Sequence, residues 1–203
     1  MMAQKKTGWN DDHYTKKARD GAFKARSVFK LEELDRKFGL FRKGDTVLDL
    51  GCAPGSWLQY VLTRIGPAGR ATGIDLQETS IPGAECIRAD IFSFPPETLS
   101  PCDAVISDMA PATSGQPFVD AQRSLELCRS AFAAAERLLK PGGAFVCKIF
   151  QGEDLDTFFR ELKPRFAALH RLKPESSREK SREIFIIGTG FRQRQTAPAQ
   201  GLG

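Results

Sequence analysis

The first segment that could bind a cofactor is a glycine-containing loop between an apolar run and a helical pattern. It reads DLGCAPGSW at residues 49–57 and places Gly51 and Gly55 four residues apart. Glycines let a ligand approach the backbone closely, and the N-terminus of the following helix offers free N–H groups. Pro54 removes one donor that a pyrophosphate-binding loop would use, so a nicotinamide oxidoreductase is the weaker interpretation. The loop favours a phosphate-free nucleoside cofactor such as S-adenosylmethionine.

Acidic residues stand at the ends of three apolar runs. Asp49 closes the first run, and Asp75 follows Gly55 by 20 residues at the end of the second. A carboxylate at that position can accept hydrogen bonds from both ribose hydroxyls. Asp90 ends the third run and can accept from an adenine amino group. One such acid often caps a helix or turn, but three at successive strand ends favour a nucleoside site.

These residues require a sheet to position them. From Gly44 onward, short β-compatible runs alternate with helical patterns, and the last two runs are close enough to form an antiparallel pair. We predict an α/β fold, a doubly wound and mostly parallel sheet with one antiparallel strand and helices on both faces, in which ligands lie beyond the carboxyl ends of the strands. The seven expected strands are residues 46–51, 71–76, 84–90, 103–109, 144–150, 166–172 and 183–189.

Four helices are expected around this sheet. Two are short, at about residues 57–64 and 153–163. A longer one over 122–139 ends at the sequence KPGG, and apolar residues spaced by three and four mark its buried face: Leu125, Cys128, Phe132, Ala135 and Leu139. A helix over about 24–38 precedes the sheet, with Val28, Leu31, Leu34 and Phe38 on one side and Arg26, Lys30 and Lys37 on the others.

The composition predicts one domain. The chain has 203 residues, 41% of them hydrophobic, without an apolar run that could cross a bilayer. The polar first residues lack a signal-peptide core, so we expect a cytoplasmic monomer without membrane contact. Five cysteines without a CxxC pair and two histidines argue against disulfides and against a metal site. We expect a flexible basic leader at 1–20, a single domain at 21–190 and a flexible tail at 191–203.

The charge is unevenly distributed along the chain. Residues 1–43 and 160–203 each carry a net charge of +6, which leaves −7 for residues 44–159 within a total of +5. Two basic ends around an acidic centre favour surfaces that meet a polyanion beside a differently charged pocket. Solvated charges on helix faces would produce a similar count, so charge alone does not decide between the two interpretations.

Five motifs along the chain carry a resemblance. ARSVFKLEEL (25–34), DLGCAPGSW (49–57), SDMAP (107–111), CKIFQG (147–152) and PESSREKSREIF (174–185) resemble, in order and spacing, the signature segments of the FtsJ/RrmJ family of ribosomal RNA methyltransferases. The resemblance spans about residues 25–190. It implies a Rossmann-like class I methyltransferase fold.

The resemblance also implies functional residues. The family's catalytic tetrad falls on Lys30, Asp108, Lys148 and Glu183. Its S-adenosylmethionine positions fall on Gly55, Trp57, Asp75, Asp90 and Asp108, to which the loop itself adds Asp49, Gly51 and Pro54. Two positions depart from the pattern: Phe185 stands where the family often has Tyr, and Ser56 where it often has a second glycine. Neither change touches the tetrad.

The tetrad suits methylation of a ribose. The 2′-oxygen must attack a sulfonium methyl group in line while it loses a proton, so the enzyme supplies a base and alignment. Two neighbouring lysines lower each other's affinity for protons, and Lys148 at a strand end is the candidate base. Asp108 would hold Lys148 in place, and Lys30 and Glu183 would orient the ribose.

The expected partner is RNA, because the 2′-hydroxyl distinguishes RNA from DNA. The residues expected to bind it are Arg26, Lys30, Arg178, Lys180 and Arg182. The resemblance favours a uridine in large-subunit ribosomal RNA within the assembled subunit. Transfer RNA, a messenger cap or another RNA is the alternative within the same chemistry. A non-catalytic assembly factor that binds S-adenosylmethionine and a small-molecule methyltransferase are further alternatives.

Overall fold

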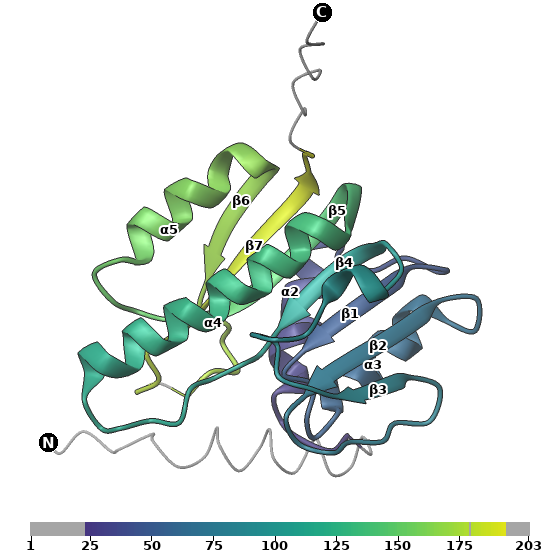
Figure 1. Ribbon diagram of the computed structural model, residues 1–203, viewed down its shortest axis with the longest axis horizontal. Helices are drawn as coiled ribbons and strands as arrows, with labels where there is room; N and C mark the ends of the chain where they lie inside the picture. Colours follow the sequence, from purple (N-terminus) through teal and green to yellow (C-terminus); the bar gives the residue numbers. More distant parts are fainter. Residues whose placement is uncertain (1–22, 179, 194–203) are drawn as a thin grey trace, which may run out of the picture.

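The computed structural model describes residues 23–178 and 180–193, and a seven-stranded sheet forms their centre (Figure 1). The strand order is β3-β2-β1-β4-β5-β7-β6, with β7 antiparallel to both of its neighbours and the other neighbouring pairs parallel. The mostly parallel, doubly wound sheet predicted from the sequence is therefore confirmed. The strands are β1 (Thr46–Leu50), β2 (Arg70–Asp75), β3 (Glu85–Arg88), β4 (Cys102–Ser107), β5 (Leu139–Phe150), β6 (Phe166–Leu172) and β7 (Glu183–Phe191).

Helices cover both faces of the sheet. On one face α2 (Val28–Phe38) and α3 (Ser56–Ile65) bury a core that includes Leu31, Trp57 and Phe185. On the other face α4 (Pro117–Leu138) and α5 (Leu155–Leu162) bury a second core around Phe145 and Phe158, as Figure 1 shows. Two 3-10 turns, η1 (Pro96–Thr98) and η2 (Lys163–Arg165), complete the elements.

Four element boundaries differ from the sequence prediction. Helix α2 begins at Val28, because residues 24–27 form turns toward α3 instead of a helical turn. Helix α4 begins at Pro117, five residues earlier than expected, since proline suits the first helical position. Leu139 leaves the helix with an extended backbone and begins β5. Strand β7 continues to Phe191, which is buried against Phe166, so the predicted boundary at 190 falls inside a strand.

Some of the sequence predictions concern features expected to be absent, and others concern residues that the structure does not describe. The leader at 1–20 and residues 194–203 of the tail fall outside the described residues. Within the described residues, the five cysteines are free and the acidic, cysteine and histidine side chains form no metal-binding cluster. Across the same region, each helix is too short or too polar to cross a bilayer.

Candidate active site

Two ion pairs form the centre of the site at the carboxyl edge of the sheet. Lys30 from α2 pairs with Glu183 at the start of β7. Lys148 Nζ on β5 lies 2.8 Å from Asp108 Oδ1 and donates a hydrogen bond to the Asp108 backbone oxygen at 2.5 Å. The four side chains are only 8–19% exposed. The structure therefore brings the four tetrad residues, which lie far apart in the sequence, into two adjoining pairs.

Strand register explains why the pairs adjoin. Lys148 is paired with Phe185 across β5 and β7, and Phe150 with Glu183. Directly opposed residues in an antiparallel pair share a face, so Lys148 and Glu183 are diagonal neighbours on one side of the sheet. That side is the one covered by α2, which brings Lys30. Asp108 follows the last residue of β4, next to β5.

The electrostatics of Glu183 favour its ionised form. Burial alone would raise the pKa of this carboxyl, but the hydrogen bond and charge of Lys30, aided by the charge of Lys148, bring the net pKa below its usual value. The hydroxyl of Ser177, in the loop that leads into β7, also lowers the pKa of Glu183. A buried carboxylate with cations on two sides can hold both lysine side chains in fixed positions.

A cavity of about 280 Å³ lies beside Asp108, beyond the ends of β1, β2, β3 and β4. Of the residues predicted to bind the cofactor, four line it: Gly51, Asp75, Asp90 and Asp108. Sequence reasoning missed the apolar part of the lining, which includes Leu76, Phe92 and Met109. Their position one or two residues after Asp75, Asp90 and Asp108 was the available signal, because the loops that follow strand ends form the rim of the ligand crevice.

Asp75 is fixed by two backbone groups. Its Oδ2 accepts a hydrogen bond from Ala53 N at 2.9 Å, and its Oδ1 accepts one from Gln77 N at 2.8 Å. Each carboxylate oxygen keeps a second lone pair. Asp75 therefore joins the cofactor loop to the end of β2 and can still accept hydrogen bonds from the paired hydroxyls of a ribose.

Asp49 lies beneath this cavity and does not line it. The carboxyl is fully buried, and neither oxygen has a hydrogen-bond partner among the described residues. Burial raises the pKa of Asp49 well above its usual value, and the negative charges of Asp108 and Asp75 raise it further. Three carboxyls close together, one of them unpartnered, form a site that suits a positively charged ligand.

The two loop glycines are required by the packing of the protein itself. Gly51 has φ +78°, and a Cβ atom there would lie 2.5 Å from Met109 Cγ. Gly55 has φ +107°, and a Cβ atom would lie 2.2 Å from Ile81 Cδ1. The space beside Gly55 is thus occupied by Ile81 and not by the cavity. Gly51 also lines the cavity, and a role of both glycines in the approach of a ligand stays a prediction.

Two further residues predicted to bind the cofactor lie outside the cavity lining. Pro54 is exposed. Trp57 is 3% exposed, its ring centre lies 6.0 Å from that of Phe185, and its indole N–H donates to the Ser27 backbone oxygen at 3.0 Å. The side chain of Trp57 therefore connects α3 to the turn before α2, the helix that carries Lys30.

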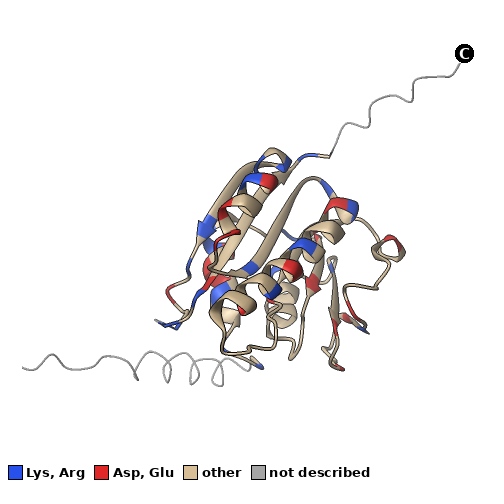
Figure 2. Ribbon diagram, turned by 60° about the vertical axis from the view of Figure 1, so that its left-hand side comes forward, with Lys and Arg blue, Asp and Glu red and all other residues tan. Residues whose placement is uncertain are grey.

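Basic residues from both ends of the chain meet at Glu183. The pKa of Arg26 is lowered by partial burial and by the positive charge of Arg178, and raised by Glu183, so these three groups are neighbours. Lys180 and Arg182 are exposed in the same loop. Figure 2 shows acidic and basic residues interspersed over the helices on the sheet. Among the described residues of the two chain ends, Arg26, Arg178, Lys180 and Arg182 therefore form a basic surface beside Glu183.

Comparisons with known proteins agree with this geometry. The family model of FtsJ-like methyltransferases matches residues 23–191. A ribosomal RNA large subunit methyltransferase E of Desulfatibacillum aliphaticivorans is 50% identical over 92% of this chain and 95% of its own. One of the same name from Bdellovibrio bacteriovorus is 45% identical over 87% of this chain and 95% of its own. A Plasmodium falciparum protein crystallised as a ribosomal RNA methyltransferase superimposes with a TM-score of 0.77 at 29% identity, over 85% of this chain and 100% of that one.

Proposed function

The chain belongs to the FtsJ-like methyltransferase family, and from that premise we propose that it transfers a methyl group from S-adenosylmethionine to a ribose 2′-oxygen in RNA. The proposed substrate is a uridine of large-subunit ribosomal RNA in the assembled subunit. Relatives at 45–50% identity bear the name of a large-subunit ribosomal RNA methyltransferase, and that name supports the substrate class. The observation that carries the reaction type is the two adjoining, buried ion pairs, one of which includes Asp108, a residue that also lines the cavity.

The residues of the cavity fit S-adenosylmethionine. Asp75 would accept from the ribose hydroxyls of the cofactor and Asp90 from its adenine amino group, while Leu76 and Phe92 offer apolar surface. The unpartnered Asp49 and the ion-paired Asp108 suit its positive charge. When bound, the cofactor supplies an electrophilic methyl group.

The tetrad would align the ribose and accept its proton. Lys148 is held by two oxygens of Asp108, so its ammonium position is fixed before substrate arrives. Lys148 would first lose one proton to solvent, and its neutral amine would then accept the proton of the 2′-hydroxyl as the oxygen attacks the methyl group. Lys30 and Glu183 would contact the neighbouring ribose or phosphate atoms. Fixing the reacting atoms about 3–3.5 Å apart lowers the barrier by several kcal/mol without an unusually strong base.

Methyl transfer to a panel of RNAs tests this proposal. The protein is incubated with methyl-labelled S-adenosylmethionine and, separately, with large ribosomal subunits that lack the modification, free ribosomal RNA and transfer RNA. We expect label at one nucleotide of the assembled large subunit. Labelling of transfer RNA alone would show that transfer RNA is the substrate instead of the large subunit. Binding to subunits without any methyl transfer would favour a non-catalytic assembly factor.

A further inference from the structure

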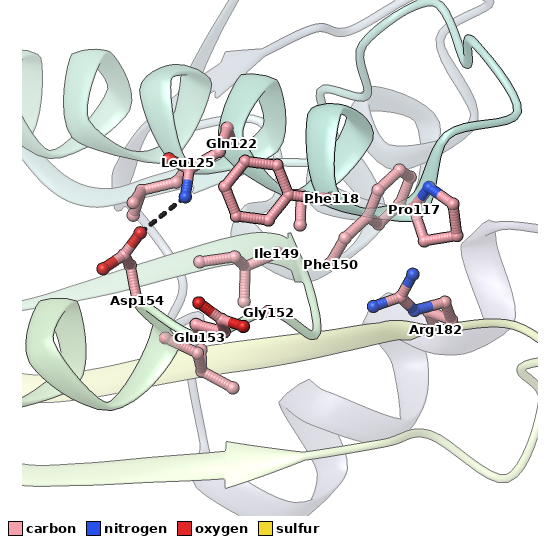
Figure 3. A pocket seen from close by; sticks show the side chains of 12 residues that line it. Pro117, Phe118, Gln122, Leu125, Ile149, Phe150, Gly152, Glu153, Asp154 and Arg182 are labelled. Atoms are coloured by element: carbon pink, nitrogen blue, oxygen red, sulfur yellow. Dashed lines mark hydrogen bonds between the residues drawn. The ribbon is translucent and has the colours of Figure 1, made fainter.

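A second pocket adjoins the tetrad on the opposite face of the sheet. It has a volume of about 240 Å³ and lies between the first turns of α4, the end of β5 and Arg182 (Figure 3). Ile149 contributes to its floor and directly follows Lys148, with the two side chains on opposite faces of β5. Arg182 directly precedes Glu183. The pocket and the tetrad therefore share one strand end and one loop end.

An exposed aromatic ring forms one wall of this pocket. Phe118, in the first turn of α4, is 62% exposed. The large hydrophobic residues that stand out as exposed in the described part of the chain are Phe118, Leu76 and Phe92, and the last two line the cofactor cavity. Complete burial of a Phe side chain is worth about 1.5–3 kcal/mol, and much of that gain is open to a ligand with an apolar face that covers Phe118.

The charged groups of the pocket are Arg182 on one side and two carboxylates, Glu153 and Asp154, on the other (Figure 3). At one end, Arg182 donates to the Gln151 backbone oxygen at 2.6 Å, which fixes its guanidinium beside Pro117. At the other end, Gln122 donates to Asp154 at 2.5 Å (Figure 3). A cation suits a phosphate, whereas a carboxylate repels phosphate and accepts hydrogen bonds from amino groups. The apolar centre between them is smaller than a site for a drug-sized ligand.

A nucleotide matches this arrangement. Unpaired RNA bases are recognised by stacking on aromatic side chains and by hydrogen bonds to their edges, and Arg contacts the adjoining phosphate. We propose that the pocket is a nucleobase subsite, which receives an unpaired base next to the methylated nucleotide, with Phe118 as the stacking surface and Arg182 at the phosphate. The inference rests on the proposed function, because the pocket and Lys148 share the end of β5 and an RNA held at Lys148 would reach both.

Methyl-transfer kinetics with large ribosomal subunits test the subsite. Phe118→Ala is expected to lower kcat/KM roughly tenfold, mainly through KM, because one stacked base is lost. The affinity for S-adenosylmethionine, measured by calorimetry, is expected to stay at the wild-type value. Phe118→Trp, which keeps an aromatic face, should restore kcat/KM. Wild-type kinetics in Phe118→Ala would overturn the proposal.

Cross-linking identifies the occupant even when methyl transfer is not observed. A photoreactive phenylalanine replaces Phe118 in the full chain, and the protein is irradiated on large ribosomal subunits. We expect a cross-link to ribosomal RNA within one or two nucleotides of the methylated position. If no methylation occurs, a cross-link to any nucleotide of ribosomal RNA is the expected result. The same group at Arg137, on α4 but about 28 Å away along the helix, is the control. Cross-links only to a ribosomal protein, or equal RNA cross-linking from both positions, would overturn the subsite without bearing on the tetrad.

Discussion

Lys148 is one of two lysines on β5 that pair with a carboxylate 2.8 Å away, and only burial and position distinguish them. Lys140 pairs with Asp103 at the opposite end of the strand, where its side chain is 44% exposed. Lys148 is 8% exposed, and its partner Asp108 lines the cofactor cavity. A partly exposed pair contributes little to stability, whereas the buried one holds an ammonium group at a fixed point of the site.

This contrast yields the first prediction. Lys148→Ala should lower the rate of methyl transfer by about 10²–10⁴-fold, because alignment and proton acceptance are both lost. Single-turnover transfer to large ribosomal subunits measures it, with the S-adenosylmethionine affinity determined in parallel. Lys140→Ala is the matched control and should keep the wild-type rate. Equal rates in both variants would remove Lys148 from the mechanism.

Asp49 leads to a prediction about pH. The pKa of Asp49 is raised in the folded state, so the folded protein favours the protonated carboxyl. The stability that this protonated form contributes is complete below the ordinary pKa of 3.8 and is lost as the pH rises through the folded-state pKa. The stability lost in this way is about 1.4 kcal/mol for each unit by which the pKa is raised. Asn cannot ionise, so the Asp49→Asn variant does not lose it. The variant should therefore melt higher than the wild type near neutral pH, by about 2–4 °C per kcal/mol, and equally at acid pH.

The same substitution should weaken binding of the cofactor. A positive ligand favours the ionised carboxyl, so Asp49→Asn should reduce the thermal shift that S-adenosylmethionine produces. Thermal melts between pH 4 and 8, with and without S-adenosylmethionine, measure both effects. A lower melting temperature at neutral pH together with an undiminished thermal shift would contradict this account of Asp49.

At the scale of elements, the contact between α3 and the turn before α2 positions Lys30. Trp57 donates its indole N–H to the Ser27 backbone oxygen, and the hydroxyls of Ser27 and Ser56 lie 3.0 Å apart. Trp57→Phe should cost about 1 kcal/mol of stability and slow methyl transfer by roughly an order of magnitude, because the Lys30 helix loses this connection.

The readouts for Trp57→Phe separate two roles of the side chain. Slower transfer with unchanged S-adenosylmethionine affinity is expected, since Trp57 does not line the cavity. Ser27→Ala keeps the backbone acceptor and should have the smaller effect. Weaker cofactor binding at a normal rate would instead establish Trp57 as a cofactor contact, as its family position implies.

Most of the sheet could be predicted from the sequence because strands β1 to β4 are short apolar runs that each end near an acid. Strand ends Asp75 and Asp108 led directly to the cavity edge. The start of α4 was missed, because Pro117 and Phe118 precede the regular spacing of three and four that marks the helix. The proline was the available signal.

Side-chain environments were less accessible to prediction than the elements. The sequence cannot show that Ile81 fills the space beside Gly55, or that Trp57 turns away from the cavity toward Ser27. Both depend on contacts between residues more than 20 positions apart. The pairing of Lys30 with Glu183 could be expected only from the family resemblance, since the two residues are 153 positions apart and strands β1 to β6 lie between them in the chain.

At the scale of the whole molecule, the two chain ends meet at the tetrad. Arg26 and Arg178 approach Glu183 from opposite ends of the sequence, and Lys180 and Arg182 extend the basic loop. Each phosphate contact adds about 0.7–0.9 to the dependence of log affinity on log salt. Changing Arg178, Lys180 and Arg182 to Gln should therefore weaken RNA binding and reduce the salt slope by about 2–3.

Binding to large ribosomal subunits across a series of KCl concentrations measures this slope. The control changes Arg70, Arg137 and Lys140, which are three basic residues away from the tetrad, to Gln, and should leave the slope unchanged. An unchanged slope in the loop variant, or the same decrease in both variants, would place the RNA elsewhere on the surface.

The most direct test of the central claim is the identity of the methylated nucleoside. Large ribosomal subunits that lack the modification are treated with the protein and S-adenosylmethionine, the RNA is digested to nucleosides, and the products are identified by mass spectrometry. The account predicts one 2′-O-methyluridine per subunit with the wild-type protein and almost none with Lys148→Ala. A base-methylated nucleoside, or an equal yield of 2′-O-methyluridine from both proteins, would contradict it.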